Sequence, residues 1–396
     1  MAKKTTLIIG ASAAGMACAN KLRGLDPEMT IICLTAEADL PYNRCLLADY
    51  LGGAKTAEQI TIRTESFFTD NAIAFRPNSR VIKIDTAEQV VTTYNQETFA
   101  YDYLFLGMGK SAFIPDKNWL SIPGVLPFYD QDHATAIRAY IAKTGAKKAV
   151  VVGAGLTGLE AADALINLGL EVEIIEQADH VLPRQIDTAG ADFLTNLMRE
   201  KAGITVHTKT YITSLQALLP LQITVSLSSG STLETHLVVV ATGGKSNSTL
   251  AQLAGIACDS YGVITDSHMR TSVPTIFAGG DACSVLDILT KERVNSCLWA
   301  DAVQQGNIAA HTIAGVEKEY PGALLITSST IFGTTFVTSG DIANANNYES
   351  LYKKDASFYH RMFIENDRLK GFIMVGNITG IGQLRRALLE QRPLTS

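Results

Sequence analysis

A strand-to-helix turn built on small residues and glycines occurs twice in this 396-residue chain. The first follows an apolar segment at 6–9 and reads Gly-Ala-Ser-Ala-Ala-Gly over residues 10–15. The second follows residues 148–152 and reads Gly-Ala-Gly-Leu-Thr-Gly over residues 153–158. We expect a helix from Leu159 to Leu168 after it. Such turns open βαβ units whose helix N-terminus holds a dinucleotide pyrophosphate. The repetition predicts an α/β fold with two Rossmann-like dinucleotide-binding domains.

Each position of the turn has a physical role. Gly10 allows a tight turn, the small Ser12 lets the backbone approach the pyrophosphate, and Gly15 lets helix and strand pack closely. In the second unit all three positions are glycine, so the fingerprint is complete. The candidate binding residues of the two turns are Gly10, Ser12, Ala13, Ala14 and Gly15, and then Gly153, Gly155, Leu156, Thr157 and Gly158.

An acidic residue lies at the end of the second strand of each unit: Glu37 shortly after the strand expected at 30–34, and Glu176 in the second unit. A carboxylate at this place accepts hydrogen bonds from the ribose hydroxyls of a dinucleotide. It also repels a 2′-phosphate, and Gln177 and Ala178 supply no arginine to hold one. The second unit therefore favours NADH over NADPH, although Arg184 lies further along the chain.

Three more apolar segments end in glycine turns, at residues 107–109, 243–244 and 279–281. Gly109 and Gly243 each mark a crossing between domains. Asp281 follows Gly280 and has two interpretations: a helix N-cap, or a carboxylate that binds the ribityl hydroxyls of a flavin.

The composition excludes several classes of function. The net charge is −6 and no run of Lys or Arg is present, which argues against nucleic acid or an anionic membrane as a partner. No apolar run is long enough to span a bilayer, and the apparent leader at residues 1–20 is better explained as the first βαβ unit. The six cysteines form no CxxC motif, which predicts reduced thiols and a cytoplasmic protein. The seven histidines are scattered, so no metal site is expected.

Together these motifs resemble the pyridine nucleotide-disulfide oxidoreductase superfamily over nearly the whole chain. The segments at 40–44, 159–160, 278–281, 299–306 and 369–377 are similar to the branch with rubredoxin reductases and the flavin portion of nitrite reductases. The resemblance implies an NAD-binding domain (111–245) inserted in a split FAD-binding domain (1–110 and 246–320). A small α+β C-terminal domain (321–396) would follow.

The resemblance also assigns roles to individual residues. The first turn with Glu37 would bind FAD, Arg44 would contact an FAD phosphate, and Asp281 the ribityl chain. The helix that starts near Trp299 would direct its N-terminus at the flavin pyrimidine, where its dipole stabilises the reduced ring. Glu160 would lie near the nicotinamide, and its alternative interpretation is an exposed acid in the first helical turn.

Two departures from the family pattern narrow the mechanism. No pair of nearby cysteines is present, so a dithiol relay is not expected. Asp49 stands where related electron-transfer reductases have a lysine, which puts a Lys–Glu pair with Glu160 in doubt. Cys45 is either a redox thiol, as in NADH oxidases and CoA-disulfide reductases, or a small packing residue. Ala13 argues against the peroxidases, which have a histidine there.

The sequence thus predicts an FAD-dependent oxidoreductase that takes hydride from NADH and passes electrons to a small redox protein or partner subunit. One alternative is an NADH oxidase or CoA-disulfide reductase that uses Cys45 as its redox thiol. A second is a flavoprotein whose cofactors serve signalling or a scaffold. The identity of the acceptor, the product of any oxygen reduction, and the choice between monomer and homodimer stay open.

Overall fold

The computed structural model describes residues 3–219, 221–391 and 393, and these fall into two compact units. Unit 1 is formed by Met1–Cys45, Ala57–Ser111 and Lys245–Leu325, and unit 2 by Leu46–Thr56, Ala112–Gly244 and Ile326–Ser396. Each unit contains one of the two glycine turns. The three-domain boundaries expected from the sequence stay a prediction.

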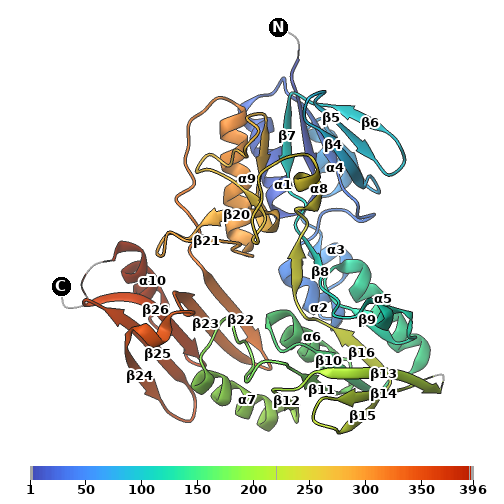
Figure 1. The fold of residues 1–396 in the computed structure, drawn as a ribbon, viewed down its shortest axis with the longest axis vertical. Coiled ribbons are helices and arrows are strands. Elements are labelled where there is room, and N and C mark those ends of the chain that lie inside the picture. The colour runs from blue at the N-terminus through green and yellow to red at the C-terminus, as the bar shows by residue number, and fades with distance from the viewer. Residues whose placement is uncertain (1–2, 220, 392, 394–396) are drawn as a thin grey trace. The chain divides into compact units, whose positions relative to one another are not determined.

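A five-stranded parallel sheet forms the centre of unit 1, in the order β19-β7-β1-β2-β3 (Figure 1). The strands are β1 (Thr5–Ile9), β2 (Thr30–Leu34), β3 (Ile73–Arg76), β7 (Tyr103–Leu106) and β19 (Ile276–Ala278). β2 and β7 lie on opposite sides of β1, so the strand order reverses there. Ligands of open α/β sheets bind beyond the carboxyl ends of strands at such a switch point.

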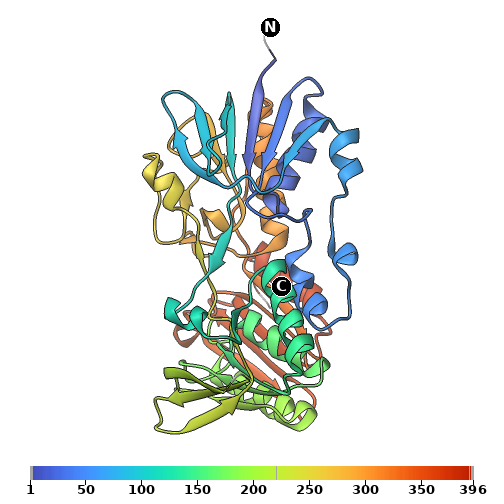
Figure 2. The same cartoon turned by 90° about the vertical axis from the view of Figure 1, so that its right-hand side faces the viewer.

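Two helices, α1 (Ala13–Leu25) and α9 (Trp299–Ile313), lie side by side against this sheet (Figures 1 and 2). Their approach needs a glycine, because a Cβ on Gly306 would lie 2.1 Å from the carbonyl oxygen of Ala14. The other elements of unit 1 are short: η1 (Arg44–Leu46), α3 (Ala57–Ile60), α4 (Glu65–Asp70), β4 (Val81–Asp85), β5 (Val90–Thr93), β6 (Thr98–Ala100), α8 (Thr249–Leu253), β18 (Val263–Ile264), η3 (Gly280–Ala282), β20 (Cys283–Leu286) and β21 (Arg293–Val294).

Unit 2 holds a second five-stranded parallel sheet, in the order β12-β11-β10-β16-β9. The strands are β9 (Val125–Pro127), β10 (Lys148–Val152), β11 (Glu171–Ile175), β12 (Thr205–His207) and β16 (Leu237–Val240). The helices and the antiparallel strands that accompany it are α2 (Leu47–Leu51), η2 (Lys117–Ser121), α5 (Gln131–Thr144), α6 (Leu156–Asn167), α7 (Thr188–Ala202), β13 (Ile212–Leu219), β14 (Gln222–Leu227) and β15 (Thr232–Thr235). The chain passes between the units at β8 (Lys110–Ala112) and β17 (Gly244–Ser246).

The last part of unit 2 is an antiparallel sheet with the order β22-β23-β26-β25-β24, built around buried Phe336, Phe363 and Phe372. Its elements are β22 (Ile326–Ile331), β23 (Thr334–Gly340), η4 (Ala345–Asn347), β24 (Glu349–Lys354), β25 (Tyr359–Glu365), β26 (Arg368–Val375) and α10 (Ile381–Glu390). The predicted α/β architecture, with two Rossmann-like parallel sheets and a C-terminal α+β segment, is confirmed. One boundary differs, because α6 begins at Leu156 instead of near Leu159, with Gly155 as its N-cap.

Candidate functional site

The first glycine turn of unit 1 has no room for side chains. Gly10 follows β1 with φ +105°, and a Cβ there would lie 2.1 Å from the carbonyl oxygen of Gly107. A Cβ on Gly15 would lie 1.9 Å from the carbonyl oxygen of Gly10. Both glycines are therefore required by close approach of backbone to backbone, as the sequence predicted for a tight turn and a closely packed helix.

The N-terminus of α1 faces this turn without a side-chain cap. Ser12 is the N-cap residue, and its hydroxyl makes no capping hydrogen bond in the structure. The first intrahelical bond is the one that Met16 N donates to Ser12 O, 2.9 Å away. The earlier N–H groups of Ala13, Ala14 and Gly15 have no partner within the helix, which is the arrangement that binds phosphate.

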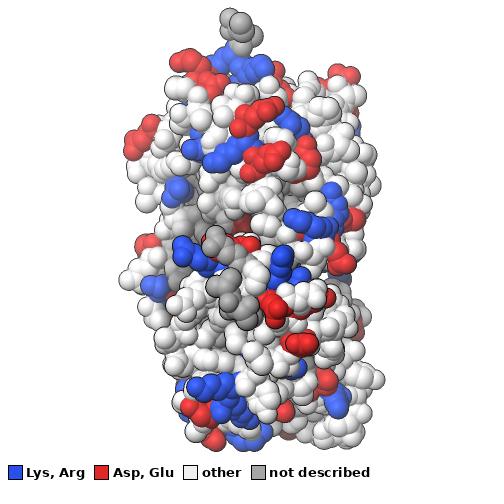
Figure 3. Space-filling view, turned by 90° about the vertical axis from the view of Figure 1, so that its left-hand side faces the viewer, with Lys and Arg blue, Asp and Glu red and all other residues white. Residues whose placement is uncertain are grey.

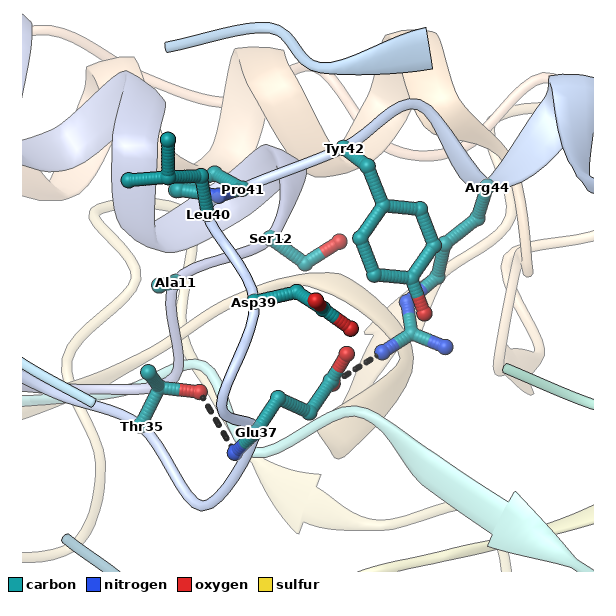
Figure 4. Close-up of a pocket in the computed structure, with 9 residues that line it drawn as sticks. All are labelled: Ala11, Ser12, Thr35, Glu37, Asp39, Leu40, Pro41, Tyr42 and Arg44. Atoms are coloured by element: carbon teal, nitrogen blue, oxygen red, sulfur yellow. Dashed lines mark hydrogen bonds and ion pairs between the residues drawn. The ribbon is translucent and has the colours of Figure 1, made fainter. Parts of the chain in front are cut away.

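A pocket lies at the carboxyl ends of β1 and β2, and Figure 4 shows its polar side chains converging. Glu37 and Arg44 form an ion pair across it, and Thr35 Oγ accepts a hydrogen bond from Glu37 N at 3.2 Å. The sequence proposed both charged residues as ligand contacts but not their pairing. Its full lining is Ala11, Ser12, Thr35, Glu37, Asp39, Leu40, Pro41, Tyr42 and Arg44.

The polar pocket residues that sequence reasoning missed are Thr35, Asp39 and Tyr42. Arg44 stacks over the ring of Tyr42, with 5.1 Å from its guanidinium carbon to the ring centroid. All three missed residues lie in the loop 35–43 between β2 and Arg44, so their closeness in sequence to the candidates Glu37 and Arg44 was the available signal.

The turn that contains Asp281 belongs to the same site, although it is more than 200 residues away from Arg44 in the sequence. β19 ends at Ala278, and Asp281 follows inside η3 without acting as a helix cap. Burial raises the pKa of Asp281, while the nearby charges of Lys110 and Arg44 oppose that rise. Arg44 is therefore close enough to influence both Glu37 and Asp281, and the N-cap interpretation of Asp281 is wrong.

Gln305 of α9 hydrogen-bonds to the turn that contains Asp281. Its side-chain Oε1 accepts hydrogen bonds from Gly280 N at 2.7 Å and from Cys283 Sγ at 3.3 Å. Its Nε2 donates to the hydroxyl of buried Tyr320 at 3.3 Å. The sequence did not identify Gln305, because a buried glutamine that supports a distant turn has no local signal. The residue fixes the backbone from which Asp281 projects.

The helix α9 begins at Trp299, as expected, and its N-cap residue Leu298 supplies no side-chain acceptor. Just before it, Cys297 has φ +52°, and its Sγ lies 2.6 Å from Nζ of Lys110. Gly109, with φ +60°, immediately precedes that lysine. The described structure of unit 1 thus brings the first turn, Arg44, Lys110 and Asp281 into one region.

The second glycine turn in unit 2 repeats the geometry of the first. Gly153 has φ +103°, and a Cβ there would lie 2.6 Å from the carbonyl oxygen of Ala241. A Cβ on Gly158 would lie 1.9 Å from Gly153 O, whereas one on Gly155 would meet nothing within 4 Å. The outer glycines are thus required by packing. The middle one leaves open space at the start of α6, where Leu156 and Thr157 form the first turn.

Glu176 closes this second turn. Its carboxylate accepts hydrogen bonds from Ala154 N at 2.6 Å and from Ala178 N at 2.7 Å. The acid therefore lies at the end of β11 beside the glycine turn, as the sequence predicted. Gly243, which follows β16, has φ +90° and open space at its Cβ position.

Glu160 lies on α6 among other acidic groups, not as an exposed helix acid. Its Oε1 accepts a hydrogen bond from Ser329 Oγ of β22 at 2.9 Å. Burial, with smaller effects from Asp49 and Asp163, raises its pKa to about 7, and the Ser329 bond opposes this. The groups that act on Glu160 within the described residues are Ser329, Asp49 and Asp163, and none of them is a lysine. Asp49 is a neighbour of Glu160, at the position where a lysine would have formed a Lys–Glu pair.

Cys45 is exposed in η1 and lies two residues before α2. Its backbone N donates to Asn43 Oδ1 at 3.0 Å. All six cysteines are free thiols, and burial raises the pKa of Cys18, Cys33 and Cys283 well above the usual thiol range. The three buried thiols are therefore unreactive.

The described residues show neither a metal-ligand cluster nor a membrane-spanning helix. No group of three or more His, Cys, Asp or Glu there could hold a metal ion. Among the helices of that same part, none has the length and apolar character needed to cross a bilayer. On the face drawn in Figure 3, Lys and Arg side chains are interspersed with Asp and Glu instead of forming one broad basic field.

Two family models match this chain. The model for pyridine nucleotide-disulphide oxidoreductase covers residues 4–306. The model for the rubredoxin NAD+ reductase C-terminal domain covers residues 327–392.

Individual relatives span different shares of their own length. An NADH oxidase of Methanocaldococcus jannaschii is 33% identical over 80% of this chain and 71% of its own. The assimilatory nitrate reductase electron transfer subunit of Bacillus subtilis is 29% identical over 100% of this chain, which spans only half (50%) of that protein. The solved structure of a ferredoxin reductase from Rhodopseudomonas palustris superposes with a TM-score of 0.90 at 26% identity, covering 99% of this chain and 96% of that one.

Proposed function

Since this chain belongs to the pyridine nucleotide-disulphide oxidoreductase family, we propose that it oxidises NADH through FAD and passes the electrons to a small redox protein or partner subunit. Members of the family are FAD- and NAD(P)H-dependent oxidoreductases, and the chain is an enzyme of that class. The observation that carries the proposal is the presence of two separate turns in which glycines are required by backbone contact. Each offers the uncapped or open helix start that a dinucleotide needs.

The residues of unit 1 fit FAD. The turn from Gly10 to Gly15, with the uncapped start of α1, would hold the pyrophosphate, and Glu37 the adenosine ribose. Arg44 would leave its ion pair with Glu37 in part to reach a phosphate, and Asp281 would accept from the ribityl hydroxyls. Trp299 and Gly109 border the same region. Bound FAD supplies a ring that accepts hydride and releases electrons to a second acceptor.

The residues of unit 2 would bind and orient NADH. Gly153, Gly155 and Gly158 leave room for the pyrophosphate at the start of α6, and Glu176 would accept from the ribose 2′-OH. Glu160 would lie near the nicotinamide as a carboxyl group that holds its proton up to about neutral pH, because it is buried among acids. A neutral group there avoids placing a charge beside the reacting ring.

The C-terminal match supports a protein as the electron acceptor. The segment 327–392 matches a domain named for rubredoxin NAD+ reductases, and the Bacillus relative is named as an electron transfer subunit. None of the six cysteines forms a disulfide in the described structure. The proposed transfer of electrons from flavin to a protein therefore involves no dithiol relay. The free thiols also support a cytoplasmic location, where cysteines stay reduced.

Replacement of Glu176 by glutamine is expected to weaken the preference for NADH. The carboxylate repels a 2′-phosphate, and glutamine removes that charge while it can still accept one of the two backbone hydrogen bonds. The ratio of kcat/KM for NADH to that for NADPH should fall about tenfold or more. Glu171→Gln, which removes an exposed charge at the other end of β11, is the matched control and should leave the ratio unchanged. An unchanged ratio in Glu176→Gln would contradict the proposed role.

Glu160→Gln is expected to stabilise the protein at alkaline pH. The pKa of Glu160 rises from 4.5 to about 7 on folding, so the folded state keeps a proton that the unfolded state loses between these values. The stability of the wild type relative to the variant therefore falls as the pH rises through that window. Above pH 7 the free energy of unfolding of the variant should exceed that of the wild type by up to about 3 kcal/mol, and below about pH 4 the gain should vanish. Urea titrations from pH 4 to pH 8.5 measure it, with exposed Glu317→Gln as a control that should show no trend.

A second candidate function is an NADH oxidase or disulfide reductase that uses Cys45. The exposure of Cys45 and the name of the Methanocaldococcus relative favour it. Cys45→Ser separates the two functions, since a redox thiol would be essential to one and irrelevant to the other. We expect turnover with a protein acceptor to stay within about twofold of the wild type. A loss of turnover of a hundredfold or more would establish the thiol mechanism instead.

The proposed function is tested by anaerobic reduction and reoxidation. Purified protein should be yellow, and stopped-flow mixing with NADH should bleach the flavin absorbance. The reduced protein is then mixed with rubredoxin, ferredoxin, CoA disulfide or oxygen, and reoxidation should be fastest with one of the two proteins. Protein that stays colourless after incubation with FAD, or that reoxidises fastest with oxygen or CoA disulfide, would refute the proposal.

A further inference from the structure

The outer strand of the C-terminal sheet has a free edge. β24 is hydrogen-bonded to β25 on one side and to no other strand of the described residues on the other (Figure 1). The opposite edge strand, β22, packs against α6. A free edge presents alternating N–H and C=O groups that can pair with another strand.

Every side chain of β24 is exposed, including two large apolar ones. Leu351 is 58% exposed and Tyr352 is 72% exposed, so neither contributes to the core of its own sheet. Because side chains alternate along a strand, Glu349, Leu351 and Lys353 share one face. The other face is partly occupied within the chain, since Ser350 accepts from Arg361 and Lys354 stacks over Phe193.

The charges on the first face cannot neutralise one another within the strand. Glu349 and Lys353 are four residues apart, which is about 13 Å along a strand. No ion pair of Glu349 occurs among the described residues, and Lys353 lies over the ring of Phe358 at 5.9 Å. A lysine on an edge strand usually prevents association. Here the acid at the other end of the same face offers a complement to it.

We propose that β24 pairs with β24 of a second copy of this chain, antiparallel about a two-fold axis at Leu351. In this register Glu349 of each copy lies opposite Lys353 of the other, and the two Leu351 side chains meet at the axis. Opposite residues of an antiparallel pair lie on the same face, so both ion pairs and the apolar contact form together. The result is a continuous sheet across an isologous interface.

Neighbouring registers are less favourable. In an antiparallel pair, two opposite residues either both direct their N–H and C=O groups at the partner strand or both direct them away. The two-fold axis must therefore pass through a residue and not between two residues, so the neighbouring registers have their axis at Ser350 or Tyr352. An axis at Tyr352 would place Glu349 opposite Asp355, which is repulsive. An axis at Ser350 would place Glu349 opposite Leu351 and Lys353 opposite Asn347, with no ion pair. Only the register about Leu351 is complementary.

One strand pair buries less surface than a standard protein interface of about 1,600 Å². The dimer is therefore weak, and its population depends on concentration and salt. The inference is independent of the proposed enzyme activity, because it rests on the edge strand alone.

Charge reversal tests the register. Sedimentation equilibrium of the full-length holoprotein, over micromolar to several hundred micromolar concentrations, measures the dimer dissociation constant. E349K places lysine opposite Lys353, and K353E places glutamate opposite Glu349, so each should weaken the dimer at least tenfold. The double variant E349K/K353E should restore it. An equimolar mixture of the two single variants should form a heterodimer, because both pairs are then of opposite charge.

K354E is the matched control, since it changes the net charge as K353E does but on the other face, opposite the uncharged Tyr348. It should dimerise like the wild type, and FAD content and melting temperature check that every variant is folded. A wild type that stays monomeric throughout would overturn the proposal. Equal effects of K353E and K354E, or no restoration in the double variant, would also overturn it. The proposal would also be overturned if the wild type were monomeric and K353E slowed turnover with a protein acceptor. That result would make β24 a docking surface for the acceptor.

Discussion

Gly15→Ala should give a protein that no longer retains FAD. The added Cβ would lie 1.9 Å from the carbonyl oxygen of Gly10, which is backbone and cannot rotate away. The start of α1 must then move off the end of β1. Its free N–H groups, on which the pyrophosphate would bind, move with it. We expect the affinity for FAD to fall by at least a hundredfold, so that the protein elutes colourless.

The measurement is the FAD dissociation constant from flavin fluorescence quenching of the apoprotein, with circular dichroism to check the fold. Gly24→Ala is the matched control, because Gly24 lies near the end of the same helix and its Cβ would meet nothing within 4 Å. That variant should bind FAD like the wild type and be slightly more stable, since alanine favours a helix over glycine. Normal FAD affinity in a folded Gly15→Ala protein would exclude the proposed cradle.

Gly158→Ala is the second large effect, and it should separate the two cofactors. Its Cβ would lie 1.9 Å from Gly153 O in unit 2, so α6 must shift at the turn that would hold NADH. Unit 1 does not contain this turn, and FAD should therefore stay bound. We expect a yellow protein whose flavin is reduced by NADH at least a hundredfold more slowly than in the wild type.

Stopped-flow bleaching at saturating NADH measures this, and dithionite reduction shows that the flavin itself is competent. Gly155→Ala is an informative companion, because its Cβ enters open space and should not disturb the apoprotein fold. It should leave the melting temperature unchanged while it raises the apparent Kd for NADH, since the methyl group would occupy space near the pyrophosphate. Rapid reduction of Gly158→Ala by NADH would place the nicotinamide site elsewhere.

Predictions from the sequence were most accurate where a short segment determines its own secondary structure. The expected strands 30–34 and 148–152 coincide with β2 and β10, and α9 begins at Trp299 as predicted. Apolar runs next to glycine turns specify a strand followed by a helix, whatever the rest of the chain does. The start of α6 was placed too late because Gly155 can serve as an N-cap.

Partners that meet only in the folded chain could not be predicted. The Glu37–Arg44 ion pair joins residues only seven positions apart, yet each was assigned separately to a ligand. The support that Gln305 gives to Gly280, and the approach of Lys110 to Cys297, join residues far apart in sequence. The exposure of a whole strand at a sheet edge, as in β24, is likewise decided by which strands pair, and pairing is not local.

By itself the sequence determined the two α/β turns, because glycine is required at positions where a Cβ would overlap the neighbouring backbone. It also determined the acids that end the strands, since their place follows from the period of the βαβ unit. Only the tertiary structure decided the environment of each acid: Glu37 beside a cation, Glu176 on backbone N–H groups, and Glu160 among carboxylates. The charge state of a carboxyl depends on burial and on neighbours within a few ångströms. For Glu160 these neighbours include Ser329 and Asp49, which are far from it in the sequence and approach it only in the folded chain.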